Sequence, residues 1–149
     1  MSNYHHILIG VDFSLETGIV IDRGLELAGS QGAKVSFIHV VEYSGYLFPP
    51  DAPFPVELDL EPQFVDKARE HLISMKKSRG RSDSACYVEE GSPTQEIVRV
   101  AEQNQVDLIV IGSHGRHGIQ RILGSTASGV THTAGCDVLA VRVGSGRME

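Results

Sequence analysis

The chain has 149 residues, of which 41% are hydrophobic and 21% charged, a composition typical of a globular domain with a buried core. Its formal net charge of −6 disfavours broad electrostatic binding to nucleic acid, so an anionic ligand would require a local site. No apolar run approaches the roughly 20 residues that span a bilayer, and the opening MSNYHHILIGVD does not resemble a signal peptide. We therefore expect a single cytoplasmic domain over residues 1–149, with neither a membrane nor a nucleic acid as partner. Cys86 and Cys136 lie far apart and are expected to be buried free thiols, which fits that location.

Five strand-like apolar runs alternate with four helical patterns along the chain. The runs cover residues 5–11, 34–41, 84–90, 106–111 and 137–143. The helical patterns cover residues 15–29, 59–79 and 93–104, and a short helix follows Ser125. The first, fourth and fifth runs contain few polar residues, which is typical of strands covered on both faces. The alternation predicts an α/β fold in which helices cover both faces of a doubly wound parallel sheet.

Each of the three longer helical patterns has an apolar face that is expected to pack on the sheet. In chain order these faces are Val20, Ile21, Gly24, Leu25 and Ala28; then Phe64, Ala68, Leu72 and Met75; then Ile97, Val98 and Ala101. The stretch Ser92-Pro93-Thr94-Gln95 is a capping box with proline at the first helical position. Gly135 follows the last helix, where we expect a left-handed cap.

Residues 42–58 interrupt the alternation, because they carry four of the six prolines and cannot form one regular element. The segment leaves the carboxyl end of the second strand, the edge at which sheets of this kind bind their ligands. A connection this long is often a lid or a binding surface. A surface loop without such a role is an equal alternative.

Residues 112–126, GSHGRHGIQRILGST, follow the fourth strand and contain the strongest candidate for a ligand site. The chain has no G-x-G-x-x-G after its first strand and no G-x-x-x-x-G-K-[ST]. Gly112 and Gly115 allow tight turns and a close approach of the backbone to a ligand. Gly124, Ser125 and Thr126 open a helix whose first N–H groups are unpaired, which favours phosphate binding. A plain loop followed by a serine cap is the alternative.

Asp12 lies just past the first strand and is the candidate partner of this segment. If the first and fourth strands are neighbours, Asp12 and Gly112 meet across one crevice, at the point where the strand order reverses. The carboxylate would then accept hydrogen bonds from a ribose or a base. The alternative is a structural role at the helix start, shared with Ser14.

The histidines do not form a convincing metal site. His5 and His6 are adjacent in a strand and point to opposite faces, and no cysteine or carboxylate completes a zinc set near His114 and His117. We expect no metal beyond Mg²⁺ carried by a nucleotide. His114 is expected to pack near the ribose or to hydrogen-bond the loop, and His39 to be a satisfied core histidine.

Taken together, these segments resemble the universal stress protein family over essentially the whole chain. The matching stretches are ILIGVDFS, FIHVVE, EEGSPTQEIVRVAEQNQVDLIVIGSHGR and GSTASGVTHTAGCDVLAVRV. The resemblance implies a five-stranded parallel sheet in the order 3-2-1-4-5, a homodimer formed through the last strand and, in many members, ATP bound where the strand order reverses.

The resemblance also implies a role for individual residues. Asp12 and the backbone of Val40 would hold the adenosine, and Gly112 and Gly115 would approach the ribose and phosphates. The phosphate chain would lie against Gly124, Ser125 and Thr126. The family pattern of G-x-x-G, nine residues and G-[ST] is one residue longer than the pattern here, where residues 116–123 separate the two parts.

The implied function is that of a small stress-response protein acting as a nucleotide-sensing dimer. Its ligand would be ATP, ADP or AMP, with or without Mg²⁺, and an unidentified protein would read its state. No base can be assigned beside a γ-phosphate, so efficient catalysis is not predicted. One alternative is a slow nucleotide hydrolase or an autophosphorylating protein, with Ser125 or Thr126 as the nearest hydroxyls. The other is a nucleotide-free dimeric interaction module, which the shortened spacing favours.

Overall fold

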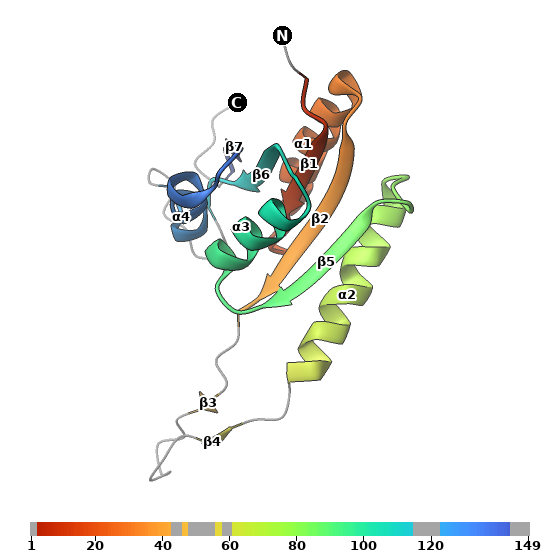
Figure 1. The fold of residues 1–149 in the computed structure, drawn as a ribbon. Helices are drawn as coiled ribbons and strands as arrows, with labels where there is room; N and C mark the ends of the chain where they lie inside the picture. Colours follow the sequence, from red (N-terminus) through yellow and green to blue (C-terminus); the bar gives the residue numbers. More distant parts are fainter. Residues whose placement is uncertain (1–2, 43–45, 48–55, 58–60, 115–122, 144–149) are drawn as a thin grey trace.

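The computed structural model of the chain describes residues 3–42, 46–47, 56–57, 61–114 and 123–143 (Figure 1). Five parallel strands form its main sheet: β1 (His6–Gly10), β2 (Lys34–Val41), β5 (Ala85–Glu90), β6 (Leu108–Gly112) and β7 (Asp137–Val141). They lie in the order β5-β2-β1-β6-β7. Counted along the chain, this is the order 3-2-1-4-5, so the predicted fold is confirmed.

Helices cover both faces of this sheet. The first face packs against α1 (Thr17–Gln31) and α2 (Glu61–Ser78), and the second against α3 (Pro93–Gln103) and α4 (Ser125–Thr133). Strand β1 is covered on both faces, which explains its apolar residues: Ile7 and Ile9 pack on the first face and Leu8 on the second, all three fully buried. No helix in the described ranges is long and apolar enough to cross a membrane.

The segment rich in proline adds an element that the predicted alternation lacked. Strands β3 (Tyr46–Leu47) and β4 (Val56–Glu57) pair antiparallel with each other and lie outside the main sheet (Figure 1). The four prolines of residues 42–58 all lie between these two dipeptides. The rest of residues 43–60 lies outside the described part of the chain.

The two predicted helix ends have different outcomes. At the start of α3, the Ser92 side chain accepts a hydrogen bond from the Gln95 N–H at 3.4 Å, and Pro93 is the first helical residue, as predicted. The left-handed cap expected at Gly135 is wrong. Helix α4 ends at Thr133, and the cap residue Ala134 is extended (φ −67°, ψ 142°), because the chain leaves directly toward β7. The left-handed cap occurs at Gly32 (φ 68°), after α1.

Phe64, Cys86 and Cys136 were expected in the core but are not fully buried. Phe64 is 54% exposed, whereas Ala68 and Leu72 of the same stripe are buried. In Figure 1 the first turns of α2 extend past the end of β5. Cys86 and Cys136 are free thiols as expected, but they are only partly buried. Both lie in or beside an edge strand of the sheet, which has a neighbour on one side only.

A polar pair is buried within the sheet beside these apolar layers. His6 Nε2 lies 2.7 Å from Ser36 Oγ, and His6 Nδ1 lies 3.0 Å from the carbonyl oxygen of Asn104. A carbonyl only accepts hydrogen bonds, so Nδ1 carries the proton and the Ser36 hydroxyl donates to Nε2. The neutral ring is therefore satisfied on both sides. Burial lowers the pKa of His6 below its ordinary value of 6.5.

This lowered pKa makes stability depend on pH. Below pH 6.5 the unfolded chain binds the His6 proton more readily than the folded chain, so the free energy of unfolding falls as the pH falls. Between about pH 7.5 and about pH 5.5, the free energy of unfolding should fall less for His6→Gln than for the unmodified protein, as measured by urea denaturation. His132→Gln, at an exposed position of α4, is the control and should retain the original loss. If the free energy of unfolding fell equally in all three proteins, the lowered pKa of His6 would be contradicted.

Candidate functional site

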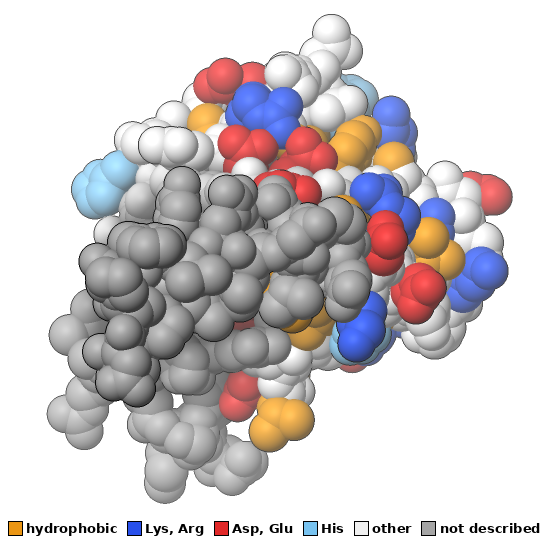
Figure 2. Space-filling view, turned by 90° about the horizontal axis from the view of Figure 1, so that it is seen from below, with side chains coloured by type: hydrophobic (Ala, Val, Ile, Leu, Met, Phe, Trp, Pro, Cys, Tyr) orange, Lys and Arg blue, Asp and Glu red, His pale blue; other side chains and the backbone are white. Residues whose placement is uncertain are grey.

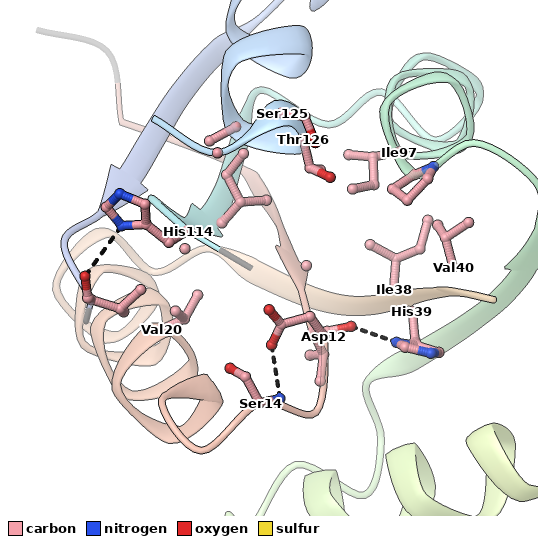
Figure 3. Close-up of a pocket in the computed structure, with 18 of the residues that line it drawn as sticks. Asp12, Ser14, Val20, Ile38, His39, Val40, Ile97, His114, Ser125 and Thr126 are labelled. Atoms are coloured by element: carbon pink, nitrogen blue, oxygen red, sulfur yellow. Dashed lines mark hydrogen bonds between the residues drawn. The ribbon is translucent and has the colours of Figure 1, made fainter. Parts of the chain in front are cut away.

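A cleft of about 770 Å³ opens at the carboxyl edge of the sheet (Figure 3). It lies where the strand order reverses around β1, which has β2 on one side and β6 on the other. The β1–α1 turn, the end of β2 and the start of α3 contribute to its walls, together with the end of β6 and the start of α4. This is the place at which open parallel sheets bind ligands, and the volume suits a small molecule.

One wall of the cleft is apolar. Ile38 and Val40 of β2 and Ile97 of α3 line it, and Figure 3 shows their side chains grouped on the same side of the cleft. All three are also members of the core between the sheet and α3. This wall offers a surface on which a flat, weakly polar group such as a nucleic base can pack.

Asp12 presents a carboxylate to the cleft from the β1–α1 turn. Its Oδ1 accepts a hydrogen bond from the Ser14 N–H at 3.0 Å, and Oδ2 makes none within the described part of the chain. The residue therefore has the local role with Ser14 that the sequence offered as an alternative, although the cap position of α1 is Glu16. The second oxygen is available to accept from a ligand hydroxyl. Asp12 and Gly112 line the same cleft, as their strand positions predicted.

The start of α4 forms the opposite side of the cleft. Figure 3 shows Ser125 and Thr126 across the cleft from Asp12 and Ser14. Ser125 and Thr126 are the first two residues of the helix, so their N–H groups have no intrahelical acceptor and carry the positive end of the dipole. The Gly124 N–H, in contrast, donates to the Ser113 carbonyl at 2.7 Å. Gly124 thus shapes the turn but does not contribute its N–H group as a ligand donor.

Other parts of the chain come close to the backbone at Gly112. A Cβ atom at this position would lie 3.3 Å from the His114 carbonyl oxygen and 3.3 Å from Cγ2 of Val20. A side chain here would also project toward the cleft that the residue lines. Gly115, the other glycine of the predicted pair, lies outside the described residues.

The two histidines at the cleft are held by backbone carbonyls. His114 is buried, with Nδ1 at 3.0 Å from Ser113 Oγ and 3.3 Å from the Val143 carbonyl, so the expected bonding to its own loop is present. Its Nε2 is buried and has no partner among the residues that the structure describes. His39 was expected in the core, but it is partly exposed and lines the cleft. Its Nδ1 lies 2.6 Å from the Val11 carbonyl.

The charges around the cleft are mainly negative in the described ranges. The lining includes the carboxylates of Asp12, Glu16 and Glu42, and no described lining residue is a lysine or an arginine. Among the coloured side chains of Figure 2, basic and acidic groups are interspersed and do not form one basic patch. Arg116 and Arg121 lie outside the described residues. Within the described ranges, no three His, Cys, Asp or Glu side chains are grouped to hold a metal ion.

This sequence and this fold match those of known proteins. Residues 3–142 match the model of the universal stress protein family. The chain belongs to the universal stress protein family. Universal stress protein A homolog 1 of Coxiella burnetii is 34% identical to this family member, over 93% of this chain and 96% of its own length.

Solved structures of other universal stress proteins resemble this one throughout. Universal stress protein UspA from Lactobacillus plantarum is 25% identical, with a TM-score of 0.75, and the match covers 95% of this chain and 100% of that one. A universal stress protein solved in complex with cAMP is 25% identical, with a TM-score of 0.61, over 94% of this chain and 98% of that one.

In this universal stress protein the cleft is also lined by several residues that were not identified as site residues from the sequence. They are Glu16 at the start of α1, Ile38 and Glu42 on and after β2, and Pro93 and Ile97 at the start of α3. The capping box was the available signal for the last two. It places the start of α3 after β5, at the same edge of the sheet as the other strand ends.

Proposed function

We propose that this universal stress protein binds an adenine nucleotide in the cleft. The observation that carries the proposal is the arrangement of three chemically different surfaces around one space. An apolar wall suits the base, the Asp12 carboxylate suits a sugar hydroxyl, and the start of α4 suits a phosphate. The relative solved with cAMP, which combines these three chemical parts, supports the proposal.

Each part of the nucleotide has proposed contacts in the cleft. The base packs against the wall formed by Ile38 and Ile97, beside the backbone of Val40, and the second oxygen of Asp12 accepts from the ribose. Gly112 and His114 line the cleft on the proposed path from the ribose to the phosphates. Gly115, which lies outside the described residues, is proposed to approach the same groups. The phosphates meet the turn at Gly124 and the N–H and hydroxyl groups of Ser125 and Thr126.

The charges of the cleft affect which nucleotide is bound. A triphosphate would bring several negative charges close to the carboxylates of Asp12, Glu16 and Glu42. Mg²⁺ bound to the phosphates would offset part of this repulsion, whereas AMP would need less compensation. We propose ATP with Mg²⁺ as the ligand, as the family resemblance implies, with ADP or AMP as alternatives. Because of the carboxylates, we expect Mg²⁺ to strengthen ATP binding more than AMP binding.

The proposed cellular role is a cytoplasmic stress response without efficient catalysis. Strand β7 is an edge of the sheet, with Val138, Leu139 and Ala140 only partly buried. A second copy that pairs along this edge would cover them, which supports a homodimer. Bound nucleotide would favour one state of the dimer or of residues 42–58, and an unidentified protein partner would bind that state.

The direct test is to denature freshly purified protein and to analyse the released small molecules by mass spectrometry. We expect an adenine nucleotide to be released, and calorimetry on the stripped protein to detect ATP binding in the presence of Mg²⁺. Protein that releases no nucleotide and binds neither ATP, ADP nor AMP would favour the nucleotide-free interaction module. The shortened spacing over residues 116–123 favours that alternative. Steady turnover of ATP that Asp12→Ala abolishes would favour a hydrolase.

A further inference from the structure

Phe13, the residue directly after Asp12, has an unusual backbone conformation. Its φ is 58°, in the left-handed region, where the side chain of a bulky residue is strained. Glycine would adopt this conformation without that strain. A strained residue of this kind persists only where its surroundings hold it, so the contacts of the phenyl ring need an explanation.

The phenyl ring lies between two histidine rings that come from different elements. On one side it stacks on His71 of α2, with ring centroids 4.2 Å apart and an interplanar angle of 11°. The other contact is His39 of β2, with centroids 4.3 Å apart and an angle of 35°. Aromatic pairs at these distances attract one another beyond the burial of their surface. Phe13 is thereby attached to both a strand and a helix.

Hydrogen bonds hold the chain on either side of Phe13. The Val11 N–H donates to the Ile38 carbonyl at 2.8 Å, and the Val11 carbonyl accepts from His39 Nδ1 at 2.6 Å. After Phe13, the Ser14 N–H donates to Asp12 Oδ1 at 3.0 Å. The direction of this N–H depends on the backbone angles of Phe13. The left-handed conformation therefore connects the stacked ring to the orientation of the Asp12 carboxylate.

We infer that Phe13 is a positioning residue, held between His39 and His71, that orients the Asp12 carboxylate toward the nucleotide. The inference rests on the proposed nucleotide binding and adds a residue that does not line the cleft itself. It also gives α2 a part in the site. None of the described residues of α2 lines the cleft, but His71 supports the β1–α1 turn through its stack on Phe13.

Binding of ATP with Mg²⁺, measured by calorimetry, tests this role in variants of the full chain. We expect Phe13→Ala to weaken binding by about tenfold, because the turn loses its anchor but keeps its strain. Phe13→Gly removes the strain as well, yet it should also weaken binding, because the glycine turn is free to sample other conformations. His71→Ala should weaken binding from the far side of the stack, and His71→Phe, which retains a ring, should restore it.

A double-mutant cycle with Asp12→Ala distinguishes positioning from general damage to the fold. If Phe13 acts through Asp12, Phe13→Ala should change the affinity by less than about twofold when Asp12 is already alanine. Hydrogen exchange of the Ser14 amide should become faster in Phe13→Ala without any nucleotide present.

Three results would overturn the inference. They are wild-type affinity in Phe13→Gly, no rescue by His71→Phe, and a Phe13→Ala effect that is equally large with Asp12 and with alanine at position 12. The failure of the proposed function is distinguishable, because the unmodified protein itself would then bind none of the nucleotides. In that case faster exchange of Ser14 in Phe13→Ala would still support the role of the ring in holding the turn, and unchanged exchange would overturn it.

Discussion

Replacing Asp12 with alanine is expected to weaken the binding of adenine nucleotide by about ten- to a hundredfold. The Asp12 carboxylate accepts a hydrogen bond from the backbone N–H of Ser14 through Oδ1, and Oδ2 has no partner among the described residues and is left for a ligand. Hydrogen bonds to charged groups are worth about 1.5–3 kcal/mol, which corresponds to this range of affinity. Calorimetric titration with ATP and Mg²⁺, and with AMP, measures the loss.

Asp83→Ala is the matched control for this prediction, because Asp83 is an exposed carboxylate between α2 and β5 and does not line the cleft. It removes the same charge from the protein and should leave the affinity unchanged. Thermal denaturation of both variants separates binding from stability, since Asp12→Ala also removes the acceptor of the Ser14 N–H. Equal affinity in Asp12→Ala and the unmodified protein would show that Asp12 serves the turn alone.

Replacing Gly24 with valine is expected to destabilise the fold by about 2–3 kcal/mol, because helix α1 crosses the sheet closely at this residue. A Cβ atom on Gly24 would lie 2.5 Å from Cδ1 and 2.8 Å from Cγ1 of Ile9, which is fully buried and has no free space in which to move. Glycine is unfavourable inside a helix, so its presence is explained by this contact. The melting temperature should fall by about 4–10 °C.

The same helix provides the control for this second prediction. Gly29 lies on the exposed side of α1, and a Cβ atom there would meet nothing within 4 Å. Gly29→Ala should therefore stabilise the protein by about 0.5–1 kcal/mol, through helix propensity alone. A similar gain in Gly24→Ala and Gly29→Ala would contradict the close packing of α1 on β1. Urea denaturation of all three variants measures these differences.

Local patterns were sufficient to predict the elements of the main sheet and its helices. Runs such as residues 34–41 and the capping box at Ser92 depend on neighbours a few residues apart, so periodicity and short motifs detect them. The same reasoning was wrong at Phe64 and Gly135. Whether the apolar face of a helix is covered depends on how far the sheet extends beneath it. How a helix ends depends on where the next strand lies.

The candidate site was also predicted only in part. The residue types at Asp12, Gly112 and Ser125 indicated their chemistry in the sequence, and the order of the parallel strands brought them to one edge. The tertiary structure alone decided which groups remain available. In the structure the Gly124 N–H donates a hydrogen bond to the Ser113 carbonyl, and the second oxygen of Asp12 has no described partner. Carboxylates also lie around the cleft.

The sequence by itself therefore determined the fold class, the family and the edge of the sheet at which a ligand would bind, because these follow from short-range patterns repeated along the chain. The tertiary structure decided the contacts between residues far apart in the chain. The stack of Phe13 with His39 and His71, the buried pair of His6 and Ser36 and the approach of Gly24 to Ile9 are of this kind. Such contacts exist only after the strands and helices have packed together, so no local pattern predicts them.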